Sequence, residues 1–334
     1  MEKIKAVNLG GWFVLERWMK PELFDEYNIP KSCETSFVTH HPSPKEALTK
    51  HWETWITKED IVWLKQKGIN LVRLPIPWWL FPEEISSEYP YVSPLKYIDQ
   101  AMDFINEVGL KVMLDLHTAP GSQNGFDNGG IDGVLTWHHK KENIDTTIKV
   151  LEKIALRYKN HPALHSIQVL NEPNIIIDMA ILEDFYIRAY HQLRPILKPE
   201  TAIVFHDGFR FSHWSGFFSE HRLSNVILDT HVYQCFDDSY NQMDANTFLN
   251  YPFVNQKRLE EMEKIVPVVV GEWSLGAKQF EYYGTRDEFE KVFAKNQFEA
   301  YSNITGWIFW AYKIKEYQSG WNFRSLIERG IISL

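Results

Sequence analysis

Two glutamates in this chain of 334 residues have the type and the setting that acid–base chemistry requires. Glu172 and Glu272 each follow an apolar run of the kind that forms a buried parallel strand. Two carboxylates that face each other across a cleft can cleave a glycosidic bond: one protonates the leaving oxygen, and the other attacks the sugar or activates water. A single such glutamate would more simply cap a helix or pair with an arginine. The presence of two, beside Asn171 and Trp273, favours catalysis.

Further polar and ionisable side chains end other apolar runs of the chain. These residues are Arg73, Asp115, His117, Asn171, His206, Asp207, His231, Tyr233 and Trp310. When strands and helices alternate around a barrel, the carboxyl ends of the strands share one face, and that face carries the active site. We therefore expect these side chains to gather around Glu172 and Glu272.

The elements that must position these residues alternate along the chain. Strand-like apolar runs occur at 6–12, 70–75, 111–117, 165–171, 201–206, 225–233, 267–273 and 305–312. Helical patterns occur at 58–67, 95–108, 143–159, 179–197, 257–264 and 286–301, whereas 208–221 has no clear pattern. Thr57 is an expected N-cap, and Gly68 and Gly109 stand where helices end.

Eight strand–helix units predict an α/β fold: a single (β/α)8 barrel that forms one catalytic domain over residues 1–334. An open, doubly wound sheet is the alternative. The sequence has no Pro-, Gly- or Ser-rich linker that would divide the chain into two domains.

The composition excludes several classes of protein. With 35 Lys and Arg against 44 Asp and Glu, the net charge is −9, and no basic stretch suits a nucleic-acid backbone. The longest apolar runs reach about half of the roughly 20 residues that span a bilayer. Two cysteines, Cys33 and Cys235, and an N-terminus without an apolar leader predict a cytoplasmic protein, or a secreted one if a leader was removed. The oligomeric state stays open.

Aromatic residues are the one compositional excess, with 13 Trp, 15 Tyr and 21 Phe making up 15% of the chain. Most such side chains fill a core, but some could line a groove for flat, amphipathic ligands such as sugars. Composition alone does not choose between these two interpretations.

Several motifs follow one another in order along nearly the whole chain. They are VNLGGWFVLE at 7–16, DLH at 115–117 with APGSQNGFDN at 119–128, LNEP at 170–173, HVY at 231–233 with Phe236, GEWS at 271–274, and GW at 306–307 with Trp310. This ordered set resembles glycoside hydrolase family 5 of clan A, and more narrowly its fungal exo-β-1,3-glucanase branch. One departure is Asn128-Gly129-Gly130, where that branch usually has Asn-Ser-Gly.

The resemblance implies a role for each matching residue. Glu172 would be the acid/base and Glu272 the nucleophile of a retaining mechanism, with Arg73 and Tyr233 holding Glu272 ionised. The other expected substrate-binding residues are Asn171 at the sugar 2-hydroxyl, His117 and His231 along the subsite of the reacting sugar, Trp310 as its floor, Glu16 at the glycone hydroxyls, Asp127 and Asn128 in the loop of Phe126, and Phe126 and Phe236 on the leaving-group side.

The two glutamates are expected to differ in pKa. Arg73 beside Glu272 should lower the pKa of that carboxyl, because an adjacent cation favours the carboxylate. A drier wall and a neighbouring carboxylate should raise the pKa of Glu172, so that it stays protonated as an acid. A retaining pair also predicts carboxyl groups about 5–5.5 Å apart.

The expected protein is an exo-acting β-glucosidase or exo-β-1,3-glucanase that uses no cofactor. Glycines within 121–130 let that loop fold tightly and bring Phe126 over the cleft, opposite Phe236. The substrate would be a β-linked oligosaccharide or β-glucoside: an imported oligosaccharide, an aryl or alkyl β-glucoside, or a glucosylated lipid. An endo-acting β-glucanase and a transglycosidase remain alternatives on the same site.

Two other classes are disfavoured. In a metal-dependent hydrolase the ligands must meet at one ion, and the adjacent pairs His40-His41 and His138-His139 cannot easily both reach one tetrahedral ion. We therefore expect no catalytic metal. A non-catalytic sugar-binding protein would keep the aromatic residues but has no need of both Glu172 and Glu272.

Overall fold

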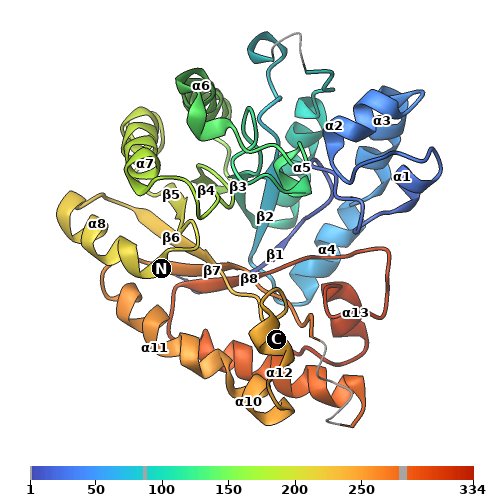
Figure 1. Cartoon of the computed structure of the whole chain (residues 1–334), viewed down its shortest axis with the longest axis vertical. Helices are drawn as coiled ribbons and strands as arrows, with labels where there is room; N and C mark the ends of the chain where they lie inside the picture. The colour runs from blue at the N-terminus through green and yellow to red at the C-terminus, as the bar shows by residue number, and fades with distance from the viewer. Residues whose placement is uncertain (1, 86–88, 278–283) are drawn as a thin grey trace.

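Eight parallel strands close into a barrel in the order of the sequence (Figure 1). A computed structural model of the chain describes residues 2–85, 89–277 and 284–334. The strands are β1 (Ile4–Asn8), β2 (Leu71–Ile76), β3 (Lys111–Leu116), β4 (Leu164–Gln168), β5 (Ala202–His206), β6 (Val226–His231), β7 (Val268–Glu272) and β8 (Gly306–Phe309). Because β1 pairs with both β2 and β8, the sheet is closed. The predicted (β/α)8 barrel is confirmed.

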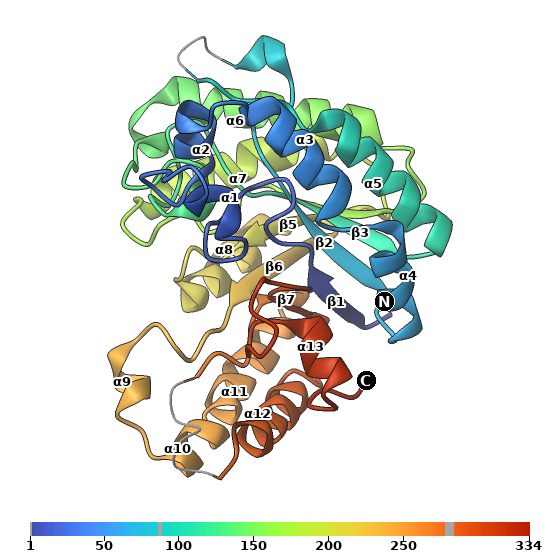
Figure 2. The ribbon, with the colours of Figure 1, turned by 90° about the vertical axis from the view of Figure 1, so that its right-hand side faces the viewer.

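Helices surround the barrel on all sides (Figures 1 and 2). Those between successive strands are α4 (Lys58–Gln66), α5 (Leu95–Val108), α6 (Lys141–Tyr158), α7 (Met179–Leu193), α8 (Trp214–His221), α11 (Pro252–Glu263) and α12 (Arg286–Ala300). The additional helices are α1 (Glu22–Asp25), α2 (Glu34–His40), α3 (Pro44–Thr54), α9 (Asp238–Asn241), α10 (Ala245–Asn250) and α13 (Phe323–Glu328). None of the helices that the structure describes is long and apolar enough to cross a membrane.

Local sequence signals set the ends of these helices. Thr57 accepts a hydrogen bond from the backbone N–H of Asp60, whose side chain accepts one from the N–H of Thr57, so the expected cap of α4 is a full capping box. Gly109 ends α5 with a φ of 74°, a left-handed conformation that favours glycine. The helix α8 lies within the segment 208–221, for which the sequence predicted no element.

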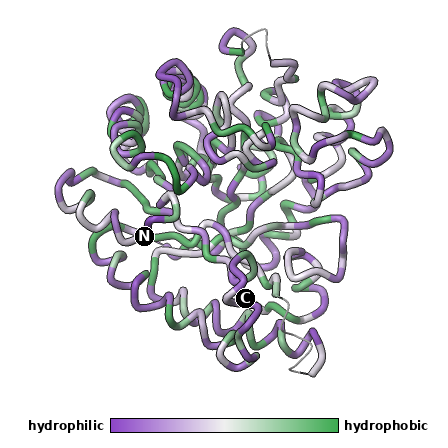
Figure 3. The backbone as a smooth tube through the Cα atoms, viewed as in Figure 1, coloured by the Kyte–Doolittle hydropathy of each residue, from purple (hydrophilic) through white to green (hydrophobic). Residues whose placement is uncertain are grey.

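The core has two layers, because side chains alternate along each strand. The inner layer fills the barrel with Ile4, Ala6, Leu71, Met113, Ala202, Val204, Ile227, Val269 and Ile308. The outer layer joins the strands to the helices and includes the fully buried Trp137, Trp214 and Trp273. Figure 3 shows hydrophobic residues along the central strands and hydrophilic ones on the outer helices. Many of the aromatic residues are therefore core.

Several strands end earlier than expected, and the chain beyond them forms the mouth of the barrel. The run predicted at 165–171 is strand only to Gln168, and the run predicted at 225–233 is strand only to His231. Beyond β4, Glu172 has a φ of 43°, which no strand accommodates. Strained backbone of this kind is concentrated at functional sites.

Candidate active site

The carboxylate of Glu272 is held by a donor on each of its oxygens. Arg73 on β2 donates from Nη1 to Oε1 at 2.8 Å, and the Tyr233 hydroxyl donates to Oε2 at 2.8 Å. All three side chains converge from different strands or strand ends. Two charge-assisted or strong donors fix the orientation of the carboxylate plane. The expected contacts of Arg73 and Tyr233 with Glu272 are therefore present.

The guanidinium of Arg73 is fully buried, and most of its hydrogen bonds are donated to side chains of the barrel. It donates to Gln168 Oε1, Asn8 Oδ1 and Asn171 Oδ1, each at 2.8 Å. Its Nη2 also lies 3.1 Å from Asp115 Oδ2. Because these partners come from several strands, the position of Arg73 is set by the closed barrel rather than by any one loop.

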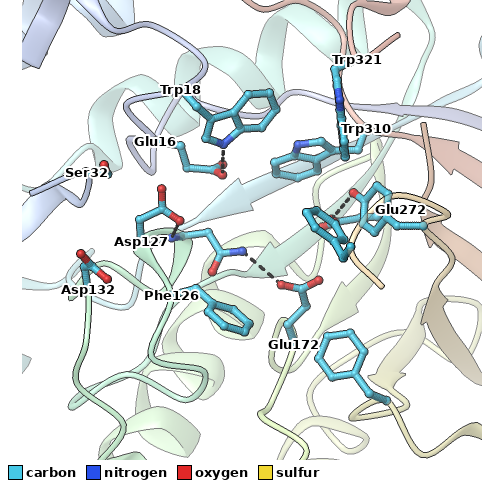
Figure 4. A pocket seen from close by; sticks show the side chains of 14 residues that line it. Glu16, Trp18, Ser32, Phe126, Asp127, Asp132, Glu172, Glu272, Trp310 and Trp321 are labelled. Atoms are coloured by element: carbon cyan, nitrogen blue, oxygen red, sulfur yellow. Dashed lines mark hydrogen bonds between the residues drawn. The ribbon is translucent and has the colours of Figure 1, made fainter. Parts of the chain in front are cut away.

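The carboxylate of Glu172 contacts an imidazole and an amide. His231 Nδ1 lies 2.7 Å from Glu172 Oε1. Asn128 donates from Nδ2 to Oε2 at 3.1 Å, the bond drawn as a dashed line to Glu172 in Figure 4. The other ring nitrogen of His231 lies 3.3 Å from Asp229 Oδ2. The register of β6 with β7 places His231 opposite Glu272, just after an irregularity at Thr230. Such bulges re-aim side chains next to active sites.

His231 also limits the distance between the two glutamates. The same Nδ1 atom lies 2.7 Å from Glu172 Oε1 and 3.4 Å from Glu272 Oε2. These two oxygens are therefore held near each other by one ring nitrogen. The separation of about 5–5.5 Å between the carboxyl groups of a retaining pair stays a prediction.

The pKa prediction from the sequence is wrong for the free protein. Burial disfavours the charged form of Glu172, but the hydrogen bond and charge of His231 outweigh it and lower the pKa of Glu172 to about 2. Burial raises the pKa of Glu272 above its usual value despite the lowering effects of His231 and Arg73. The physical reason is His231, whose position between the carboxylates could not be read from the sequence. The pKa of His231 is itself raised, because Glu272 and Asp229 outweigh its burial.

The pocket beside these carboxylates encloses about 890 Å³. One wall carries Glu16 and Asp127, and the ring of Trp310 lies to the side of them (Figure 4). Trp18 donates from its indole N–H to Glu16 Oε2 at 2.9 Å. Within the described part of the chain, the buried Oε1 of Glu16 has no hydrogen-bond partner, so it is free to accept from a ligand hydroxyl.

Burial raises the pKa of Glu16 well above its usual value, and the charge of Asp127 raises it further. Burial also raises the pKa of Asp127. This wall therefore offers carboxyl groups that can donate hydrogen bonds to sugar hydroxyls as well as accept them.

Two exposed phenylalanines also belong to the pocket lining. Phe126 and Phe236 line the pocket and are 47% and 76% exposed, so neither is core packing. Phe236 lies edge-on to Tyr233 with ring centroids 5.3 Å apart. The prediction that both phenylalanines flank the pocket is in line with these positions.

Four of the predicted substrate-binding residues lie beneath the pocket surface. His117 is fully buried and stacks on Trp310 with ring centroids 5.6 Å apart, while its Nδ1 lies 2.6 Å from Asp115. The His231 side chain is also buried, and Arg73 and Asn171 are fully buried. His117 thus lies behind the Trp310 ring and His231 beside Glu172, and their place along a sugar subsite stays a prediction.

Several pocket residues were missed by the sequence reasoning. Trp18, Phe209 and Trp321 line the pocket, as do Ser32 and Asp132. Phe209 has a φ of 59°, which is unusual for a residue with a bulky side chain, and its N–H donates to Asp207 at 2.8 Å. The sequence signal that could have identified Phe209 is its position three residues after His206, the histidine at the end of β5.

One cluster among the described residues has donor atoms close enough to hold a metal ion: Glu172, His206 and His231, within 4.8 Å of one another. Its hydrogen bonds suit proton sharing better. His206 Nδ1 accepts the N–H of Gly208 at 3.0 Å, so the hydrogen of the neutral ring is on Nε2. A nitrogen that carries hydrogen has no lone pair for a metal. The pKa of His206 is lowered to about 3 by burial and by the charge of His231, so this ring stays neutral.

Comparison with known proteins shows which family this chain resembles. A family model described as Cellulase (glycosyl hydrolase family 5) matches residues 35–316. The chain is 34% identical to the glucan 1,3-beta-glucosidase of Blumeria graminis, over 99% of this chain and 87% of that protein. It is 33% identical to the probable glucan 1,3-beta-glucosidase A of Aspergillus fumigatus, over 98% of this chain and 86% of that protein.

Solved structures share the fold. A rutinosidase from Aspergillus niger superposes with a TM-score of 0.82 at 21% identity, over 98% of this chain and 97% of that one. Cel5A of Thermotoga maritima superposes with a TM-score of 0.64 at 15% identity, over 98% and 97%. At these identities the likeness concerns the fold alone. The family model and the two relatives above 30% identity, in contrast, show that this chain belongs to glycoside hydrolase family 5.

Proposed function

We propose that this chain is a retaining, exo-acting β-glucosidase that releases one terminal glucosyl residue, with β-1,3-linked glucosides as its oligosaccharide substrates. One observation carries the proposal. Glu172 and Glu272 line the same pocket, Glu272 with a donor on each oxygen and Glu172 in contact with an imidazole. The linkage is supported by the names of the two glucan 1,3-beta-glucosidases that the chain resembles.

In the first step, an oxygen of Glu272 attacks the anomeric carbon while the glycosidic bond breaks. The proton that the leaving oxygen needs comes from Glu172. The lowered pKa of Glu172 and the raised pKa of His231 favour this proton on His231 in the free protein, 2.7 Å from Glu172 Oε1. The neutral ring with hydrogen on Nε2 donates to Asp229 and accepts on Nδ1, so moving the proton to Glu172 needs no rotation of the ring.

In the second step, Glu172 takes a proton from water, and the resulting hydroxyl attacks the anomeric carbon as the bond to Glu272 breaks. Glu272 is then an uncharged ester, so His231 has lost one of the negative charges that raise its pKa. The imidazole and Glu172 together thus give up and regain one proton per cycle.

Replacement of each glutamate tests the assignment. Glu272→Ala should abolish hydrolysis of every β-glucoside, and azide should restore activity by forming the inverted α-glucosyl azide. Glu172→Ala should spare substrates with good leaving groups and yield the retained β-glucosyl azide. Glu53→Ala, an exposed glutamate of α3, is the matched control and should behave like the wild type. The opposite azide products would reverse the roles.

Stereochemistry and product length test the remaining parts of the proposal. Proton NMR of the first sugar released should show the β-anomer, and an initial α-anomer would rule out the retaining mechanism. Early hydrolysis of laminari-oligosaccharides should release glucose alone. Early release of longer fragments would mean an endo-acting enzyme, and longer products built from the substrate would mean a transglycosidase.

A further inference from the structure

Exposed hydrophobic side chains are concentrated around the mouth of the pocket. Among the described residues, twelve large hydrophobic side chains are exposed, and six of them belong to this region: Trp18, Phe126, Phe209 and Phe236 line the pocket, and Ile175 and Ile176 follow Glu172 in the connection from β4 to α7. Isolated exposed hydrophobic residues are normal, but a contiguous group marks a binding surface.

Ile175 and Ile176, here called the isoleucine rim, are 55% and 69% exposed. The turn that carries them is tied to the loop of Phe126. Asn174 donates from its backbone N–H to Gln123 O at 3.0 Å and from Nδ2 to Asn124 O at 2.9 Å. The rim is therefore fixed beside the loop that brings Phe126 to the pocket.

The same turn is also tied to the segment of Phe209. Arg210 donates from Nη1 to the carbonyl of Ile177 at 2.6 Å. A Cβ placed on Gly208 would lie 3.6 Å from the carbonyl of Pro173, so the two turns are in contact. The isoleucine rim thus lies between the loop of Phe126 and the turn of Phe209, two residues that line the pocket.

The side chains of the isoleucine rim and of Asn174 beside it leave few hydrogen-bond donors or acceptors for the hydroxyl groups of a sugar. The Asn174 side chain uses its amide group on Asn124 and its Oδ1 on the N–H of Ile176, at 3.1 Å. Pro173 has no N–H. Unlike the rings of Phe126 and Phe236, isoleucine side chains give sugars no flat face for stacking. A sugar hydroxyl pressed against them would lose water without gaining a hydrogen bond, which is unfavourable.

We propose that the isoleucine rim binds a hydrocarbon aglycone, so that the substrates turned over most efficiently are β-glucosides of long alkyl or isoprenoid-like alcohols. This inference rests on the proposed β-glucosidase function and specifies its substrate class. The glucosyl unit lies against the wall of Glu16 and Asp127, the first part of the aglycone passes Phe126 and Phe236, and the remaining chain lies on Ile175 and Ile176.

The test is a series of n-alkyl β-glucosides from methyl to octyl, each below its micellar concentration. In the wild type, kcat/KM should rise with chain length, by up to a factor of about four for each methylene that leaves water. In the double variant Ile175→Ser/Ile176→Ser, the ratio of octyl to methyl kcat/KM should fall by roughly tenfold or more. Val254→Ser, an equally exposed position on α11, is the control and should keep the wild-type ratio.

Each outcome decides the proposal. An alkyl series that is flat in the wild type, or a chain-length dependence that the double variant keeps, would overturn it. So would laminari-oligosaccharides of matching length that are cleaved more efficiently than octyl glucoside. Hydrolysis of nitrophenyl β-glucoside separates a failure of the β-glucosidase function from a failure of the rim proposal. If the wild type does not hydrolyse it, the proposed β-glucosidase function is wrong. If the wild type hydrolyses it and the alkyl series is flat, only the rim proposal is wrong.

Discussion

Replacement of His231 by glutamine tests whether the acid/base is a pair of groups that share one proton. Burial alone would lower the pKa of His231, but Glu272 and Asp229 raise it well above the usual value of 6.5. In the wild type, activity should therefore fall at high pH only when the pair of Glu172 and His231 loses its proton. In His231→Gln, the Glu172 carboxyl alone holds that proton, so the basic limb of the pH profile should move to lower pH.

The size of the shift follows from the contact that is removed. A hydrogen bond to a charged group contributes roughly 1.5–3 kcal/mol, and one pKa unit corresponds to about 1.36 kcal/mol. The 2.7 Å contact between His231 and Glu172 therefore predicts a displacement of about one to two pH units. The basic limb of kcat/KM for an alkyl β-glucoside is the measurement, because a poor leaving group needs the acid. If the basic limb of His231→Gln stays at its wild-type pH, then Glu172 and His231 do not share a proton.

The control for this experiment is His165→Gln, a partly buried histidine of β4 that hydrogen-bonds Ser166 rather than a carboxylate of the site. It should leave the basic limb unchanged. Thermal unfolding of each variant shows whether a loss of activity at high pH is caused by unfolding of the protein. A shift of equal size in the control would mean that the limb reports the stability of the barrel instead of the site.

Three further predictions concern Phe126 and Phe236 of the pocket, the support of the site and the fold. Phe126→Ala and Phe236→Ala should reduce kcat/KM on laminaribiose far more than on nitrophenyl β-glucoside, since their exposed rings lie on the leaving-group side; equal losses would contradict this. Gly271→Ala would place a Cβ 2.1 Å from Asp229 Oδ1, so kcat should fall and unfolding should become easier by about 1–3 kcal/mol; an unchanged melting curve would contradict this. Thr57→Ala removes the capping box of α4 and should lower the free energy of unfolding in urea by about 1 kcal/mol, with kcat unchanged.

The fold was predictable because its signals are local. Apolar runs flanked by capping residues such as Thr57 and Gly109 identified the strands and the main helices. Most missed helices lie in connections of the barrel, as α3 and α8 do, where short polar or aromatic stretches carry no long period. The strand ends were predicted several residues late, because a strand residue and a left-handed residue such as Glu172 look alike in sequence.

The candidate site was predictable in its members but not in its electrostatics. Glu172, Glu272 and Arg73 were identified from their strand-end positions, and the structure brings them together. The pKa order of the two glutamates depends on which carboxylate an imidazole contacts, and that contact joins residues 59 positions apart in the chain. A sequence can place a histidine at a strand end, but it cannot say at which of two neighbouring carboxylates its nitrogen points.

Asp229 explains why the histidine points where it does. Its Oδ2 accepts from Gln168 at 2.7 Å, and its Oδ1 accepts from the backbone N–H of Gly271 at 2.8 Å. With both oxygens already fixed by β4 and β7, the 3.3 Å contact to His231 Nε2 orients the ring and leaves Nδ1 facing Glu172. Only glycine fits at 271 beside this carboxylate. The environment of Glu172 thus depends on a residue without a side chain, one position before Glu272, whose role in the motif GEWS at 271–274 only the packing against Asp229 explains.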